Sequence, residues 1–162
     1  MSELTLIILS VALTVMVCLP LVLTSLKQKN KGNLLKEQLK SEAQVSHLKS
    51  GDFETWREAY CIGLDQKNNQ LLFLNSMDNE KQVQKIDLSN VRLCRPIRNF
   101  REMKVGKEKR QIIQKVSLEL DQFDEQTKSF TIDIYDEEKS DYMINEWELA
   151  QTWSQKINNR KN

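Results

Sequence analysis

Arginine and lysine side chains recur at every third position between residues 92 and 110, and they are the side chains of this chain best suited to binding chemistry. Arginine offers a planar pair of donors that fits a phosphate or a carboxylate, whereas lysine acts as a point charge. The stretch holds eight bases against two acids, a net charge of +6. It predicts a surface that contacts anionic lipid or a protein partner, formed by Arg92, Arg95, Arg98, Arg101, Lys104, Lys107 and Arg110.

A spacing of three matches neither the period of a strand nor that of an ideal helix, so these bases would not line one regular face. Two interpretations stay open. The stretch is either a charged loop that joins two strands or an anion-facing patch, in which each base near an anionic membrane surface contributes about 1 kcal/mol. Nucleic acid is disfavoured as a partner, because no known module is recognisable and Phe100 is the single interleaved aromatic residue.

Catalytic and metal-binding patterns are missing from the sequence. The chain has a single histidine, His47, and three cysteines that form no C-x-x-C motif. Its four glycines are scattered, so there is no phosphate-binding loop. An acidic cluster between residues 133 and 141 lacks the spacing of a calcium loop and is interpreted as a solvated edge. We therefore expect a protein without catalytic activity, cofactor or metal.

Residues 4–26 form a run of 23 residues without a charge. A helix of this length measures roughly 34 Å, which is enough to cross the hydrocarbon core of a bilayer. A cleaved signal peptide fits less well, because residues 1–3 carry no base and the apolar run is too long. Lysines follow the run directly, so the sequence predicts a single-pass inner-membrane protein with its N-terminus outside and residues 27–162 in the cytoplasm.

The composition of the sequence divides the whole chain into four predicted parts. Residues 1–3 would be a short exterior N-terminus, 4–26 a transmembrane helix, 27–51 a basic hinge with Gly32 as a helix breaker followed by an amphipathic helix, and 52–162 one globular domain. The helical pattern in 27–51 is too short to establish a coiled coil, so a homo-oligomer through residues 4–48 stays open.

Alternating apolar residues predict antiparallel strands in the globular part. One expected hairpin joins an alternating segment, marked by Trp56, Tyr60, Ile62 and Leu64, to residues 70–75, and 113–120 and 130–135 form a second. The chain then ends in a helix whose N-terminal cap would be Ser140 or Asp141. Its apolar stripe predicts a buried face, with a structural core formed by Trp147, Trp153 and Ile157.

Several short segments together resemble the bacterial pleckstrin-homology-like (PH-like) family across about residues 55–158. They are YCIGLD at 60–65, LLFL at 71–74, IDLSNV at 86–91, VSLEL at 116–120, IYD at 134–136 and the final Ala150-x-x-Trp153-x-x-x-Ile157. The resemblance implies a strongly bent antiparallel sheet capped by a C-terminal helix, in a module that binds lipid headgroups or proteins. The expected fold class is a transmembrane helix plus an α+β, mainly β domain, in which a bent sheet or barrel of about six or seven strands is capped by that helix.

The function expected from these features is a membrane-anchored cytoplasmic binding or scaffold module, with a protein as its partner. Two alternatives remain: a module that binds anionic lipid through 92–110, and an accessory subunit of a membrane enzyme complex.

Overall fold

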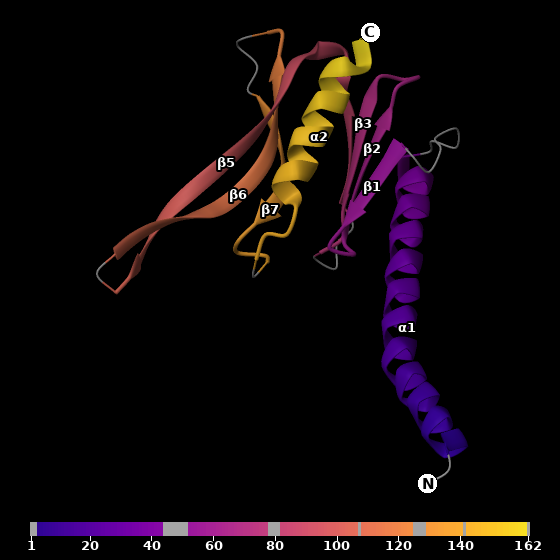
Figure 1. The fold of residues 1–162 in the computed structure, drawn as a ribbon. Helices are drawn as coiled ribbons and strands as arrows, with labels where there is room; N and C mark the ends of the chain where they lie inside the picture. Colours follow the sequence, from indigo (N-terminus) through magenta and orange to yellow (C-terminus); the bar gives the residue numbers. More distant parts are fainter. Residues whose placement is uncertain are drawn as a thin grey trace. The chain divides into compact units, whose positions relative to one another are not determined.

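The computed structural model describes residues 3–43, 52–77, 82–106, 108–124, 129–140 and 142–161 (Figure 1). The chain divides into two compact units. The first comprises Met1–Asp65 and Leu71–Ile86, and the second comprises Gln66–Gln70 and Asp87–Asn162. Each unit is described by itself.

The first unit contains one long helix and a four-stranded sheet. Helix α1 runs over Glu3–Ala43. The strands are β1 (Phe53–Trp56), β2 (Tyr60–Asp65), β3 (Gln70–Asn75) and β4 (Gln82–Asp87), and they lie in the order β1-β2-β3-β4. Strands β1 and β2 are antiparallel, with Phe53 opposite Gly63.

The second half of α1 packs against this sheet. Leu35 and Leu39 are buried in a core cluster with Phe53, Cys61, Leu72 and Leu74. Gly32 allows the helix to come close to β1, because a Cβ atom at this position would lie 3.0 Å from Thr55 Oγ1. Gly32 is therefore a packing residue inside a continuous helix, and not the helix breaker that the sequence indicated.

The structure overturns the prediction of a membrane anchor. Among the residues that it describes, no helix is long and apolar enough to cross a membrane. Residues 4–26 belong to one helix of 41 residues that continues through the lysines expected to form a hinge. The sequence predicted a transmembrane helix in a single-pass protein of the inner membrane, with its N-terminus outside. These predictions are wrong.

The second unit contains a three-stranded antiparallel sheet and the C-terminal helix. A short 3₁₀ helix, η2 (Leu88–Asn90), precedes β5 (Val91–Val105), β6 (Glu108–Gln122) and β7 (Phe130–Asp136), which lie in the order β5-β6-β7. Helix α2 (Glu146–Asn158) and the 3₁₀ helix η3 (Asn159–Lys161) follow. The buried side chains of this unit come from both the sheet and α2, and include Val116, Leu118, Leu120, Ile132, Leu149, Ala150, Trp153 and Ile157.

The predicted single bent sheet or barrel is wrong, because the strands form two open sheets of four and three strands. The first sheet ends with β4 and the second begins with β5. Between these strands, Asp87 caps the 3₁₀ helix η2 by accepting a hydrogen bond from the Ser89 N–H at 2.8 Å. The chain thus passes through this capped turn from the first sheet to the second.

Helix α2 begins later than the sequence indicated. Ser140 precedes the helix by several residues, and Asp141 lies outside the described residues. The helix starts at Glu146, and its N-cap residue Asn145 makes no side-chain capping bond. Instead, the buried Glu146 carboxylate accepts hydrogen bonds from the N–H groups of Ile144 and Asn145, at 2.6 and 3.1 Å. This carboxylate satisfies backbone donors just before the first turn.

Candidate functional site

The basic stretch is a β-hairpin and not a loop. It occupies nearly all of β5 and the beginning of β6, which pair from Val91 to Val105 on one strand and from Glu108 to Gln122 on the other. Val105 lies opposite Glu108, so the turn contains two residues, and Gly106 has a φ of +65° there. Tight hairpin turns require such positive φ angles, and glycine adopts them without steric cost. The interpretation of 92–110 as a loop is therefore wrong.

The hairpin is longer than the strand beside it. Strand β7 pairs only with Lys115–Leu120 of β6, so beyond Lys115 the strands β5 and β6 form a ribbon of two strands (Figure 1). We call residues 99–114 the basic arm. It contains five bases and two acids, which are Arg101, Lys104, Lys107, Lys109, Arg110, Glu102 and Glu108.

The strand register divides the bases of β5 between the two faces of the ribbon. Arg98 lies opposite Val116, on the face that carries the core residues, whereas Arg95 lies opposite Glu119 on the other face. A spacing of three in a structure of period two must alternate in this way. Within the arm, Phe100 and Lys104 share one face, and Arg101 and Met103 share the other.

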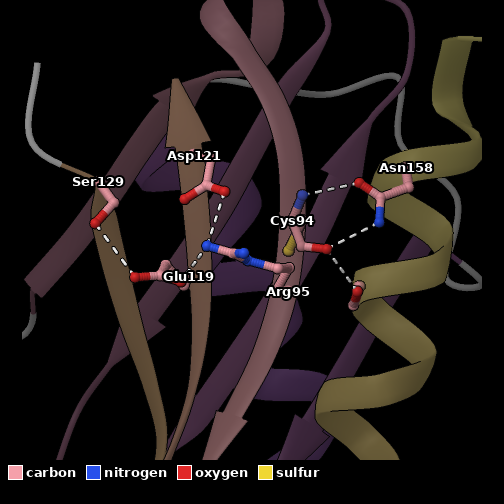
Figure 2. A network of polar contacts seen from close by, with 7 residues as sticks. Cys94, Arg95, Glu119, Asp121, Ser129 and Asn158 are labelled. Atoms are coloured by element: carbon pink, nitrogen blue, oxygen red, sulfur yellow. Dashed lines mark hydrogen bonds and ion pairs between the residues drawn. The ribbon is translucent and has the colours of Figure 1, made fainter. Parts of the chain in front are cut away.

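Arg95, near the base of the hairpin, is neutralised within the chain. Its Nη2 atom lies 3.0 Å from Glu119 Oε2 and 2.9 Å from Asp121 Oδ2 (Figure 2). Lys115, on the same face, makes the same kind of contacts, 3.0 Å to Asp133 and 3.2 Å to Asp136. The hydrogen bond to Asp133 is the main reason why the pKa of Lys115 is raised. Neither cation is free to bind an external anion.

Arg98 is held by aromatic rings. Its guanidinium carbon lies 3.8 Å from the centre of the Trp147 ring and 5.8 Å from that of Phe100. Trp147 is half-buried, whereas Trp153 is 1% exposed and Ile157 is fully buried. The Trp153 ring is covered on its outer side by Lys156, 4.6 Å away. The two tryptophans therefore do not form an open platform for a ligand.

Arg101 forms a bidentate pair with Glu137, just after β7. Arg101 Nε lies 2.6 Å from Glu137 Oε2, and Nη2 contacts Oε1. The hydrogen bonds lower the pKa of Glu137 and raise that of Arg101. Both residues line a shallow depression of 390 Å³ together with Gln114 and Glu138. This pair connects the beginning of the arm to the end of the sheet.

The basic residues toward the tip of the arm have the weakest contacts with other residues of the chain. Lys109 contacts Glu102 at 2.9 Å and Arg110 contacts Glu108 at 3.2 Å, and all four side chains are at least 60% exposed. Lys104 lies directly opposite Lys109 and forms no ion pair with any described residue. Arg92, at the other end of β5, is exposed and likewise forms no ion pair with a described residue. Lys107 lies outside the described residues. Exposed pairs are weak, so Lys109 and Arg110 can exchange these acids for an external anion, and Lys104 can bind one without such an exchange.

The edge of β5 is closed by α2, a feature that sequence analysis missed. The Cys94 N–H donates to Asn158 Oδ1 at 2.8 Å, and the Cys94 carbonyl accepts from Ser154 Oγ at 2.8 Å and from Asn158 Nδ2 at 2.9 Å (Figure 2). The signal in the sequence was the pair of polar residues four positions apart, next to the apolar stripe.

The two buried cysteines, Cys61 and Cys94, are unsuited to nucleophilic chemistry. Burial raises the pKa of both the Cys61 and the Cys94 thiol to about 12. Both are therefore protonated at neutral pH. His47 lies outside the described residues, and the described residues hold no group of three or more histidine, cysteine, aspartate or glutamate side chains that could bind a metal ion.

Comparisons with known proteins found no matching family model, no matching curated protein and no matching solved structure. The resemblance to the PH-like family thus stays a prediction.

Proposed function

We propose that this chain is a non-catalytic binding module whose basic arm contacts an acidic surface of a partner protein. The observation that carries the proposal is the contrast among the bases of one hairpin. Arg95 and Arg98 are held by carboxylates and by aromatic rings, whereas Lys104 has no ion pair with a described residue, and Lys109 and Arg110 pair only with exposed acids. Arg92, at the other end of β5, also has no ion pair with a described residue, but it lies outside the arm.

Exposed apolar side chains next to these bases support a macromolecular partner. Phe100 is 50% exposed and Met103 is 39% exposed, and they lie on opposite faces of the arm. Aromatic residues, methionine and arginine are enriched at protein interfaces. Charge would then direct the approach of the partner, and Phe100 and Met103 would supply contact area.

The acids near the arm also support a role without catalysis. Asp133 and Asp136 contact Lys115, and Glu137 contacts Arg101. Because its ion pair lowers its pKa, Glu137 is an ionised carboxylate at neutral pH and is unsuited to donate a proton.

The proposal is tested by replacing Lys104, Lys109 and Arg110 with glutamine in the full-length chain. The matched control replaces Lys29, Lys67 and Lys85, three exposed bases elsewhere, so that both variants lose the same charge. The probe is a fluorescent polyglutamate peptide, measured by anisotropy at increasing salt. We expect the arm variant to bind at least about tenfold more weakly than wild type, and the control to stay within about twofold.

Three outcomes would contradict the proposal. The wild type fails to bind the peptide, both variants lose equal affinity, or the arm is required only for flotation with phosphatidylglycerol vesicles. The last outcome would support the alternative in which the arm binds anionic lipid.

A further inference from the structure

The basic arm has an uncovered strand edge on the side where β7 ends. Strand β6 extends from Glu108, but β7 pairs with it only from Lys115 onward. The last covered group on this side is the Gln114 carbonyl, which accepts a hydrogen bond from the Glu137 N–H at 2.9 Å. In the part of the chain that the structure describes, no third strand pairs with residues 108–113.

Uncovered strand edges are templates for another strand, and proteins normally protect them. The base of this hairpin shows such protection, because α2 closes the opposite edge at Cys94. In the arm, the protection consists of charge alone, from Lys109 and Arg110. Bases repel a basic strand but attract an acidic one, so the charge selects the occupant of the edge.

The same charge excludes a second copy of this chain as the occupant. Two copies that paired along this edge would bring Lys109 and Arg110 of one chain close to the same residues of the other. Like charges on neighbouring strands are destabilising. An extended acidic segment would instead place carboxylates next to Lys109 or Arg110, and it would satisfy the outward N–H and C=O groups of the edge.

We infer that the partner binds by strand addition: an extended acidic segment pairs with residues 108–113 of β6. This inference rests on the proposed function and adds the mode of recognition. Backbone hydrogen bonds would hold the segment, and a segment that alternates acidic and apolar residues would place its carboxylates on one face, beside either Lys109 or Arg110.

The test uses two short peptides that alternate glutamate with valine and differ only in their backbone. One is unmodified, and the other is N-methylated at alternate residues, which removes the donors that a strand needs but keeps the charge and the side chains. With the full-length wild-type chain, we expect the N-methylated peptide to bind at least about tenfold more weakly. A peptide that alternates lysine with valine serves as the control for charge and should not bind.

Hydrogen exchange locates the site. The unmodified peptide should slow amide exchange within 108–113 and leave β7 unchanged. Equal affinity of the two glutamate peptides, or slowed exchange only elsewhere, would overturn strand addition while leaving the arm as a charged contact surface. Absence of binding by both peptides would overturn strand addition, and loss of polyglutamate binding as well would overturn the proposed function.

Discussion

Near its base, the β5–β6 ribbon pairs with β7 along one edge and is closed by α2 at Cys94 along the other, whereas beyond Lys115 the strands β5 and β6 form a ribbon of two strands alone. The bases differ in the same way. Arg95, Arg98 and Lys115 are held by carboxylates or rings, whereas Lys104, Lys109 and Arg110 are exposed. An excess of basic residues in the sequence therefore does not by itself form an anion-binding surface. Only bases that the fold leaves unpaired, or pairs with nothing but exposed acids, are available.

The largest expected effect is in the core beneath the base of the hairpin. Trp153→Ala should reduce the free energy of unfolding by about 3–5 kcal/mol, because it empties a fully buried aromatic site. Urea denaturation of the full-length chain measures this change. Trp147→Ala is the matched control, since Trp147 is only half-buried and should cost less. Equal losses would show that the core does not centre on Trp153.

A smaller effect is expected from opening the covered edge. Asn158→Ala removes the two hydrogen bonds between the Asn158 amide and the Cys94 backbone, and it leaves the buried Cys94 N–H unsatisfied. This should reduce the free energy of unfolding by about 1–3 kcal/mol. Asn159→Ala, at the exposed neighbouring position, should be close to neutral. If the two variants have the same denaturation midpoint, the contacts of α2 do not protect this edge.

The smallest effect concerns the junction of the two regions. The Arg101 pair lowers the pKa of Glu137, so the pair stabilises the folded chain above the ordinary pKa of a glutamate and is lost as the pH falls through the lowered value. In Arg101→Gln, an NMR titration should show the Glu137 pKa rising toward its ordinary range. An unchanged pKa in this variant would mean that Arg101 does not hold the arm at Glu137.

Alternation of apolar residues allowed part of the fold to be predicted from sequence. The second predicted hairpin, 113–120 with 130–135, lies within the observed strands, as does 70–75 of the first. The segment expected from Trp56 to Leu64 is divided between β1, which ends at Trp56, and β2, which begins at Tyr60. The first half of the long hairpin was missed, because charged residues at every third position obscured the alternation of residues 92–105. The strand propensity of a residue reflects mainly how its side chain packs on a half-buried face of a sheet, and few side chains of the arm are buried.

Other features depended on contacts that no local pattern contains. Gly32 follows a run of lysines and was interpreted as a breaker, whereas its role is to admit β1 close to α1. The sequence around residues 87–90 does not reveal whether the strands on either side pair with one another, and in the structure they belong to different sheets. Likewise, the sequence shows which residues are basic and not which of them meet a carboxylate after folding.

The most direct test of the central claim follows individual lysines while the acidic peptide binds. In NMR spectra of the full-length chain, the side-chain signals of Lys104 and Lys109 should shift as polyglutamate is added, because these cations are exposed in the arm. Lys115, which is held by Asp133 and Asp136, should not shift. Equal shifts for Lys115 and the arm lysines, or none for the arm lysines, would contradict the account.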